Sequence, residues 1–219
     1  MPADQKWMIL ISTGSSDVEV KKSHFLGELK RCRSEEEATE FIAEIRRKHR
    51  DARHHCFAMR IGKPGNVFER SSDDGEPQGT AGKPMLDLLK GACLYDVCAV
   101  VTRYFGGTLL GTGGLVRAYS DALKEALNAS ESAELKEGYR IALRCDYALA
   151  NKIRRAAASM ELYTMEENYG ADCELVYLVP AEEAGQFERK VTELSAGQAE
   201  TGSGMPVMFY GIEKPAIYT

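Results

Sequence analysis

The sequence predicts an α+β protein of two domains, residues 1–136 and 137–219. Both halves of the chain mix segments in which every second residue is apolar, as in a half-buried strand, with segments of the helical 3.6-residue period. A polar stretch, Glu131–Gly138, lies between the halves and is predicted to be the interdomain linker. A chain of 219 residues can form two small domains that each bury a core, and a hydrophobic content of 44% is ordinary for globular proteins.

The first half is predicted to begin with a strand, because the residues of Val18–Leu29 alternate between apolar and polar. Ser34 and Glu37 have the spacing of a capping box, so we expect a helix that runs from there to about Lys48. The remaining periodic segments predict three strands and two helices. The strands are Cys56–Ile61, Val67–Arg70 and Asp96–Tyr104, and the helices are Pro84–Lys90 and Leu115–Leu127.

The second half has a simpler order of predicted elements. Strands are expected over Tyr139–Cys145, Glu161–Glu167, Cys173–Val179 and Pro206–Tyr210, and helices over Ala148–Met160 and Glu182–Leu194. Read along the chain, these elements give the order βαββαβ. That order is typical of a ferredoxin-like sandwich, in which two helices pack on one antiparallel sheet.

Charge and cysteine usage exclude several classes of protein. The net charge is −5, and residues 1–136 carry twenty basic and twenty acidic side chains, so a uniformly basic nucleic-acid binder is not indicated. No run of eighteen apolar residues predicts a transmembrane helix, and the first residues do not resemble a signal peptide. The six cysteines are scattered without a CxxC pair, which favours reduced thiols. We therefore expect a cytoplasmic protein without a membrane partner.

A glycine-rich segment is the strongest chemical signal. Five glycines fall within nine residues between the predicted strand that ends at Tyr104 and the next predicted helix. A glycine loop that leads into a helix offers free N–H groups and a positive dipole end to an anion. Arg103 and Arg117 flank it, and Tyr104 and Phe105 could stack on a base. The alternative is a tight connection with glycines for packing and aromatic side chains in the core. The spacing matches neither a Walker A loop nor a GxGxxG fingerprint.

A long polar segment, Glu69–Pro84, precedes the predicted second helix. Asp73, Asp74 and Glu76 could together hold Mg²⁺ through carboxylate oxygens, although Asp-Gly and Glu-Pro are equally ordinary in turns. Thr80 is a candidate cap for the helix, and Lys83 could contact an anion there.

A third segment, Arg46–His55, carries five basic residues and three histidines. It suits a solvated helix end whose cations favour the helix dipole, and the alternative is a phosphate-binding patch. His54 and His55 are adjacent in a predicted extended segment, so their side chains are expected on opposite faces.

Several of these motifs together resemble the YigZ/Impact family. The similar segments are Val20–Phe25, Ala52–Ala58, Ser71–Pro84, Val100–Gly107 and Gly111–Leu123, in that order. The resemblance implies an N-terminal domain, with a mixed sheet and helices, that is similar to the second domain of a small-subunit ribosomal protein. It implies a C-terminal ferredoxin-like domain similar to domains of elongation factor G. It also implies a link to translation, since eukaryotic Impact regulates translation by competing for the activator of a starvation-sensing kinase.

We therefore expect a non-enzymatic regulator of translation or of a stress response that binds RNA, the ribosome or translation factors. No cofactor is expected, apart from Mg²⁺ if the three carboxylates bind it. Two alternatives stay open: an enzyme that acts on a nucleotide or a phosphorylated small molecule with Mg²⁺, and a pure protein-interaction module. The expected phosphate- or nucleic-acid-binding residues are Arg53, His54, Lys83, Arg103, Tyr104, Phe105, Gly106, Gly107, Gly111, Gly113, Gly114 and Arg117.

Overall fold

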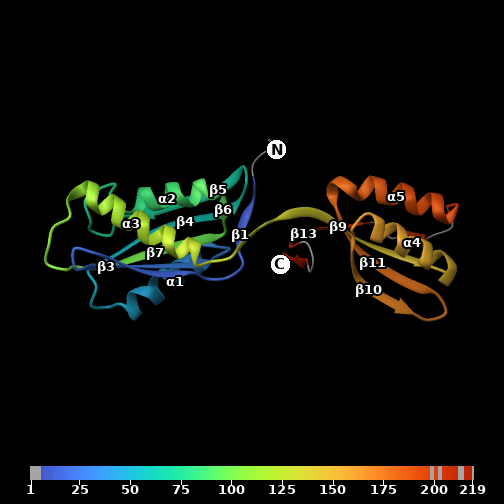
Figure 1. Cartoon of the computed structure of the whole chain (residues 1–219), viewed down its shortest axis with the longest axis horizontal. Coiled ribbons are helices and arrows are strands. Elements are labelled where there is room, and N and C mark those ends of the chain that lie inside the picture. Colours follow the sequence, from blue (N-terminus) through green and yellow to red (C-terminus); the bar gives the residue numbers. More distant parts are fainter. Residues whose placement is uncertain (1–5, 198–199, 202–203, 212–214, 219) are drawn as a thin grey trace. The chain divides into compact units, whose positions relative to one another are not determined.

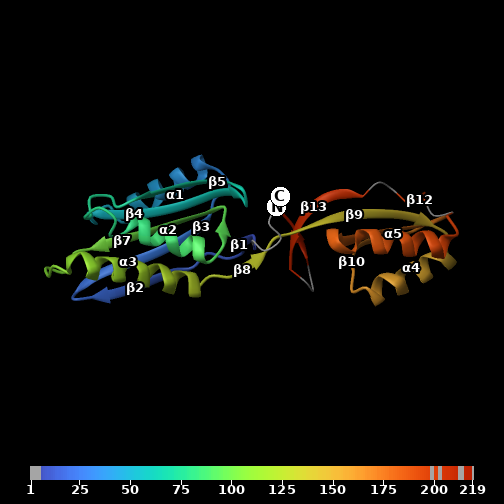
Figure 2. The ribbon, with the colours of Figure 1, turned by 90° about the horizontal axis from the view of Figure 1, so that it is seen from above.

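The computed structural model describes residues 6–197, 200–201, 204–211 and 215–218. The chain forms two compact units, Met1–Glu134 and Leu135–Thr219, and both mix helices with sheets (Figures 1 and 2). The predicted two-domain α+β class is therefore confirmed. Among the described residues, no helix has the length and apolar character needed to span a bilayer.

The first unit is built on a five-stranded antiparallel sheet. Its strands are β2 (Ser15–Val20), β3 (Ser23–Arg31), β4 (His54–Lys63), β5 (Asn66–Ser72) and β7 (Val97–Tyr104). They lie in the order β2-β3-β7-β4-β5, so that β7 is central and hydrogen-bonded on both sides. This central place explains why Cys98–Val101 form a continuous apolar run, since both faces of β7 are covered.

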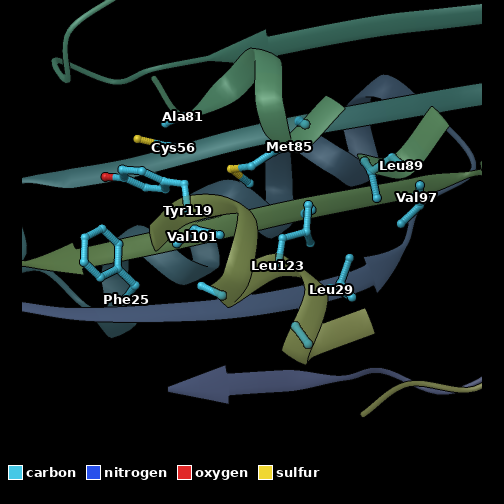
Figure 3. Close-up of a cluster of buried hydrophobic side chains, with 14 of the residues drawn as sticks. Phe25, Leu29, Cys56, Ala81, Met85, Leu89, Val97, Val101, Tyr119 and Leu123 are labelled. Atoms are coloured by element: carbon cyan, nitrogen blue, oxygen red, sulfur yellow. The ribbon is translucent and has the colours of Figure 1, made fainter. Parts of the chain in front are cut away.

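Helices cover both faces of this sheet and enclose two hydrophobic cores (Figure 2). Helix α1 (Glu35–Lys48) packs on one face, where Phe41, Ile42 and Ile45 meet Val100. Helices α2 (Gly82–Gly91) and α3 (Gly111–Asn128) pack on the other face. Figure 3 shows this larger core, whose labelled members include Phe25, Leu29, Met85, Leu89, Val101, Tyr119 and Leu123.

Helix α1 begins as the sequence predicts. The Ser34 hydroxyl accepts a hydrogen bond from the Glu37 backbone N–H at 3.2 Å, and the Glu37 carboxylate accepts one from the Arg33 N–H at 2.9 Å. Two backbone donors at the helix start are thereby satisfied, and acidic residues fill the first turn while Arg46, Arg47 and Lys48 fill the last.

The predicted single strand over Val18–Leu29 is wrong. A hairpin turn at Lys21 and Lys22 separates β2 from β3, with φ values of 49° and 65°. Two consecutive residues with positive φ match the twist of a hairpin, but glycine and asparagine usually supply them. A Lys-Lys pair gives no such signal. The alternation of apolar and polar residues therefore predicts one continuous strand where the structure has two.

The boundary between the two units falls inside the predicted linker Glu131–Gly138, but most of this segment is strand and not an irregular connection. Its first part is strand β8 (Ser132–Glu134), which pairs antiparallel with β1 (Met8–Leu10). Strand β1 also pairs in parallel with β6 (Leu94–Tyr95), which completes a small mixed sheet. Strand β9 (Lys136–Cys145) already belongs to the second unit, so only Leu135 lies between the last strand of one unit and the first strand of the next.

The second unit has the predicted βαββαβ order. After β9 come α4 (Tyr147–Ser159), β10 (Tyr163–Tyr169), β11 (Cys173–Pro180), α5 (Ala181–Ser195) and β13 (Met205–Tyr210). The spatial order β10-β11-β9-β13, with antiparallel neighbours, is that of a ferredoxin-like sheet. Short strands β12 (Glu200–Thr201) and β14 (Ala216–Ile217) extend it. Side chains of both helices, among them Ile153, Phe187 and Val191, pack in its core.

Candidate functional site

A pocket of about 450 Å³ lies in the first unit. The start of β4, the loop that precedes α2, the end of β7 and the first turns of α3 all contribute to it. Its polar side chains come from all three chain segments that the sequence motifs single out: Arg46–His55, Glu69–Pro84 and the glycine-rich segment with its flanking residues. The lining residues are Arg53, His54, Glu76, Pro77, Arg103, Phe105, Leu109, Leu110, Gly111, Thr112 and Leu115.

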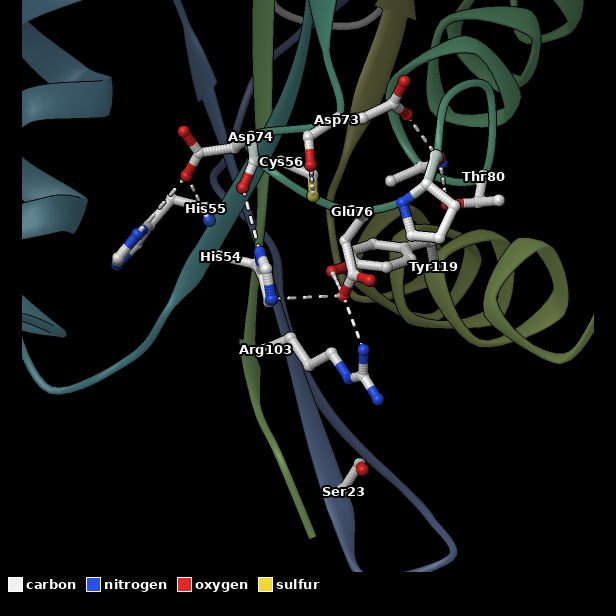
Figure 4. Close-up of polar contacts among 12 residues, drawn as sticks. Ser23, His54, His55, Cys56, Asp73, Asp74, Glu76, Thr80, Arg103 and Tyr119 are labelled. Atoms are coloured by element: carbon white, nitrogen blue, oxygen red, sulfur yellow. Dashed lines mark hydrogen bonds and ion pairs between the residues drawn. The ribbon is translucent and has the colours of Figure 1, made fainter. Parts of the chain in front are cut away.

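The polar end of the pocket is centred on the Glu76 carboxylate (Figure 4). Its Oε1 accepts hydrogen bonds from Nη1 of Arg103 at 2.6 Å and from the hydroxyl of Tyr119 at 2.9 Å. His54 Nε2 lies 4.0 Å from the same oxygen. The side chains of Glu76 and Arg103 are only 4% and 6% exposed, so their charges compensate each other away from water.

The hydrogen bond of His54 to the backbone fixes its tautomer. Nδ1 lies 2.9 Å from the carbonyl oxygen of Asp74, which can only accept, so Nδ1 carries the proton and donates. His54 Nε2 therefore faces the pocket and Glu76. His55 points the opposite way, as expected for adjacent strand residues, and its Nε2 lies 3.1 Å from the carbonyl oxygen of His49. Burial lowers the pKa of His55, although that carbonyl and Asp74 oppose the effect.

The three carboxylates that sequence analysis grouped as Mg²⁺ ligands have separate partners. Asp73 accepts hydrogen bonds from the backbone N–H groups of Gly79, Ala81 and Gly82 at 2.8–2.9 Å. Asp74 accepts from Arg46 at 2.6 Å and from the His55 N–H at 2.7 Å, while Glu76 holds Arg103. Within the part of the chain that the structure describes, no group of three or more histidine, cysteine or acidic side chains is placed to hold a metal ion.

Asp73 takes the role that sequence analysis gave to Thr80. The Thr80 hydroxyl donates to the Pro77 carbonyl oxygen at 2.7 Å, so Thr80 closes its own turn and does not cap α2. The Asp73 carboxylate instead receives the N–H groups at the start of α2, where a negative charge is favoured. Burial raises the pKa of Asp73, but these three donors outweigh it and the net shift is downward.

The five glycines of the glycine-rich segment differ in backbone conformation and in the space around the position of a Cβ atom. A Cβ on Gly106 would lie 2.1 Å from the carbonyl carbon and oxygen of Lys22, so this glycine permits a close backbone approach. Gly107 and Gly111 have φ values of 86° and 69°. Gly113 has open space around its Cβ position, and Gly114 has only the Leu110 Cβ at 3.1 Å. Helix α3 begins at Gly111, so the last three glycines form its first turn and not a loop.

The aromatic residues of this segment separate into one exposed and one half-buried ring. Phe105 is 52% exposed, and the Arg103 guanidinium lies 5.4 Å from its ring centroid. The Tyr104 side chain instead points to the α1 side, where its hydroxyl lies 3.0 Å from Nδ1 of His49. Of the two aromatic residues, only Phe105 lines the pocket.

The candidate cations also differ. Arg53 is exposed at the pocket, and Arg117 is exposed on α3, four residues after Gly113 and thus on the same helix face. Neither forms an ion pair with the described residues. Lys83 lies outside the pocket lining and is paired with Asp87 at 3.3 Å. Arg103 is buried against Glu76, so its expected role as an exposed phosphate contact does not fit this geometry.

Cys56 and Tyr119 lie beside the pocket but have no sequence signature. The Cys56 thiol donates to the Asp73 carbonyl oxygen at 3.0 Å. Burial raises the pKa of the Cys56 thiol and of the Tyr119 hydroxyl well above their usual values, so both stay protonated at neutral pH. Both groups therefore serve as hydrogen-bond donors here. Nothing in the sequence spacing connects Tyr119 to Glu76, so the sequence predicts it only as part of the helix.

Comparisons with known proteins agree with this two-part architecture. The Impact N-terminal domain matches residues 21–127, and a domain of unknown function (DUF1949) matches residues 143–198. An IMPACT family member of Haemophilus influenzae is 40% identical over 82% of this chain and 88% of its own length. The IMPACT family member YvyE of Bacillus subtilis is 39% identical over 87% of this chain and 88% of its own.

A solved structure is similar over nearly the same range. The crystal structure of a hypothetical protein, 35% identical, covers 90% of this chain and 96% of that chain with a TM-score of 0.57. The matched segments include the strand β4, the loop that carries Glu76 and the glycine-rich segment, which together build the pocket. From the extent and identity of these matches, the chain belongs to the IMPACT family.

Proposed function

We propose that this protein is a non-enzymatic regulator of translation that binds ribosomal RNA through the surface around the pocket of its first unit. Membership of the IMPACT family supports the connection to translation, because the eukaryotic branch of that family regulates it. The site supports binding without chemistry of its own, since Asp73, Asp74, the Oε1 of Glu76 and the Cys56 thiol are held by protein partners.

The observation that carries the RNA proposal is the combination of groups at the pocket. Exposed Arg53 and exposed Phe105 line it together with Gly111 and Thr112, the first residues of α3. This helix start has no side-chain cap and no acidic residue in its first turn, so its N–H groups favour an anion. Arg117 lies further along the same helix, on the face that Gly113 leaves open. Cations, free N–H groups and an aromatic ring are what an RNA strand requires.

Co-sedimentation with ribosomes tests the proposal. The wild-type protein is compared with the double variant Arg53→Ala/Arg117→Ala at about 50 and 200 mM salt. The matched control is Lys83→Ala/Lys124→Ala, which removes the same charge from residues that are ion-paired on their own helices. We expect the wild type and the control to pellet with ribosomes at low salt and less at higher salt, and the double variant to stay in the supernatant.

Two results would contradict the proposal. Equal pelleting of all three proteins would show that the surface around the pocket is not used. Retention on nuclease-treated particles would show that a protein component is the partner, which would support the interaction-module alternative. Filter binding to purified ribosomal RNA gives the direct measure. When the logarithm of the binding constant is plotted against the logarithm of the salt concentration, the slope should become less steep by roughly 0.7 for each phosphate contact that is removed.

A further inference from the structure

We infer that the pocket accepts a single nucleotide extruded from an RNA strand, with the base inside and the phosphate at the start of α3. This inference rests on the proposed function and names the ligand of the same site. The argument uses the size of the pocket, the polar groups at its inner end, its apolar wall and the distribution of charge around it.

The size of the pocket suits one nucleotide. A volume of about 450 Å³ lies in the range of roughly 300–1,000 Å³ that is usual for small-molecule sites. A stacked RNA helix could not enter such a space, whereas an unstacked base could. Recognition of single-stranded RNA commonly proceeds by splaying bases out of the strand and hydrogen-bonding their edges.

The inner end of the pocket presents a donor and an acceptor side by side. Glu76 Oε1 is occupied by Arg103 and Tyr119, and no hydrogen bond to a described residue involves Glu76 Oε2. Arg103 donates through Nη1, and its Nη2 forms no hydrogen bond to a described residue and, unlike Nε, is not fully buried. Every nucleobase carries a donor next to an acceptor on its Watson–Crick edge. A carboxylate beside a guanidinium matches that edge.

The wall of the pocket is apolar and offers a ring for stacking. One face of the Phe105 ring contacts the Arg103 guanidinium, and the ring is nevertheless 52% exposed. Leu109 is 82% exposed beside it, and Leu110 and Leu115 complete the apolar lining. Exposed leucine and phenylalanine side chains at a polar pocket are costly in water, and a base covers such groups through its π-face.

The charges give the nucleotide one orientation. Glu76 and Arg103 compensate each other's charge, so the inner end offers no net positive charge to a phosphate. The N–H groups of Gly111 and Thr112 and the exposed cation of Arg53 are the favourable places for it. The base therefore points inward and the phosphodiester chain outward, where the strand can continue toward Gly113 and Arg117.

Calorimetric titration of the full chain with the four ribonucleoside 5′-monophosphates tests this inference. Ribose 5-phosphate and inorganic phosphate serve as probes without a base. The variant Phe105→Ala removes the stacking ring, and Phe68→Ala is its control, because Phe68 is 44% exposed on β5 and does not line the pocket. Both rings are exposed, so neither variant is expected to unfold.

We expect saturable binding of mononucleotides, weakened about tenfold by Phe105→Ala and unchanged by Phe68→Ala. Equal affinity for ribose 5-phosphate would overturn the inference, since it would reduce the site to an anion site. Absent mononucleotide binding, with ribosome binding retained, would overturn the inference but leave the proposed function standing. Mononucleotide binding without ribosome binding would support the nucleotide pocket and contradict the proposed role in translation.

Discussion

Arg103 and Glu76 form a charge pair that is almost completely removed from water, with Nη1 and Oε1 2.6 Å apart. The Arg103 guanidinium also lies 5.4 Å from the centroid of the Phe25 ring, so its surroundings are apolar on that side. Each charge is tolerated inside the protein because the other is present. The pair therefore connects the loop before α2 to the central strand β7.

Substitution Glu76→Ala is expected to destabilise the protein by about 3–5 kcal/mol, because it leaves the buried Arg103 charge without its counterion. Urea unfolding measures the change. The control Tyr119→Phe removes a single hydrogen bond to the same carboxylate and is expected to cost about 1 kcal/mol. If both variants lost the same small amount, the guanidinium would have another partner in solution.

Gly106 and Gly113 are expected to respond oppositely to alanine. A Cβ at Gly106 would collide with the backbone of Lys22 and Ser23 at 2.1–2.4 Å, which no side-chain rearrangement can relieve. Gly106→Ala should therefore lower the unfolding midpoint strongly. Gly113 has open space and lies in the first turn of α3, so Gly113→Ala should stabilise the fold by about 0.5–1 kcal/mol. Thermal unfolding of the two variants provides the comparison, and a stable Gly106→Ala protein would refute the close approach.

Asp73 should make the stability of the first unit sensitive to acid. Its pKa is lowered in the folded protein, because the N–H donors of Gly79, Gly82 and Ala81 outweigh the effect of burial. Such a carboxylate makes its full contribution to the free energy of unfolding above about pH 3.9, the pKa of an aspartate in the unfolded chain. The contribution is lost as the pH falls through the lower pKa of Asp73 in the folded protein. Asp73→Asn should therefore be less stable than the wild type at pH 7, and the difference should shrink below about pH 4. Urea unfolding between pH 2 and 7 measures it; a difference independent of pH would mean that the charge of Asp73 is irrelevant.

Cys93 is expected to react first among the six thiols. It is the one cysteine that is partly exposed, whereas the other five are buried. Burial raises the pKa of Cys32 to about 12, and it also raises the pKa of Cys56, Cys98 and Cys145. Because the thiolate is the reactive form, iodoacetamide at neutral pH should label Cys93 and leave the others unlabelled until denaturant is added. Peptide mass spectrometry reads out the positions, and early labelling of Cys56 would show that the pocket opens.

The sequence predicts the second unit better than the first. Alternating strands and amphipathic helices follow each other there with local turns, so periodicity alone gives the βαββαβ order. In the first unit, β1 and β8 have three residues each and are defined by pairing with one another, which no local pattern reveals. The sequence does not indicate the hairpin at Lys21 and Lys22, because lysine is an unusual residue type at positive φ.

For the candidate site, too, the sequence indicates which segments take part but not which of their residues contact each other. The sequence indicates all three segments that build the pocket, since glycine, aromatic and charged residues gather in them. It did not predict that Arg103 would meet Glu76, or that Asp73 would hold the start of α2. These contacts join residues that only the folded sheet brings together, so residue types indicated polar chemistry but not which groups remain available to a ligand.

The pairing of β1 with β8 has a consequence for synthesis of the chain. Leu10 lies opposite Ser132, so the strand that is made first completes its sheet only after almost the whole unit has been made. Before that point, the nascent chain exposes the edge of β1 next to the buried side chains of Ile9 and Leu10. An incomplete first unit therefore differs from a finished one by an open strand edge, and that edge can close only once Glu134 is available to pair with Met8.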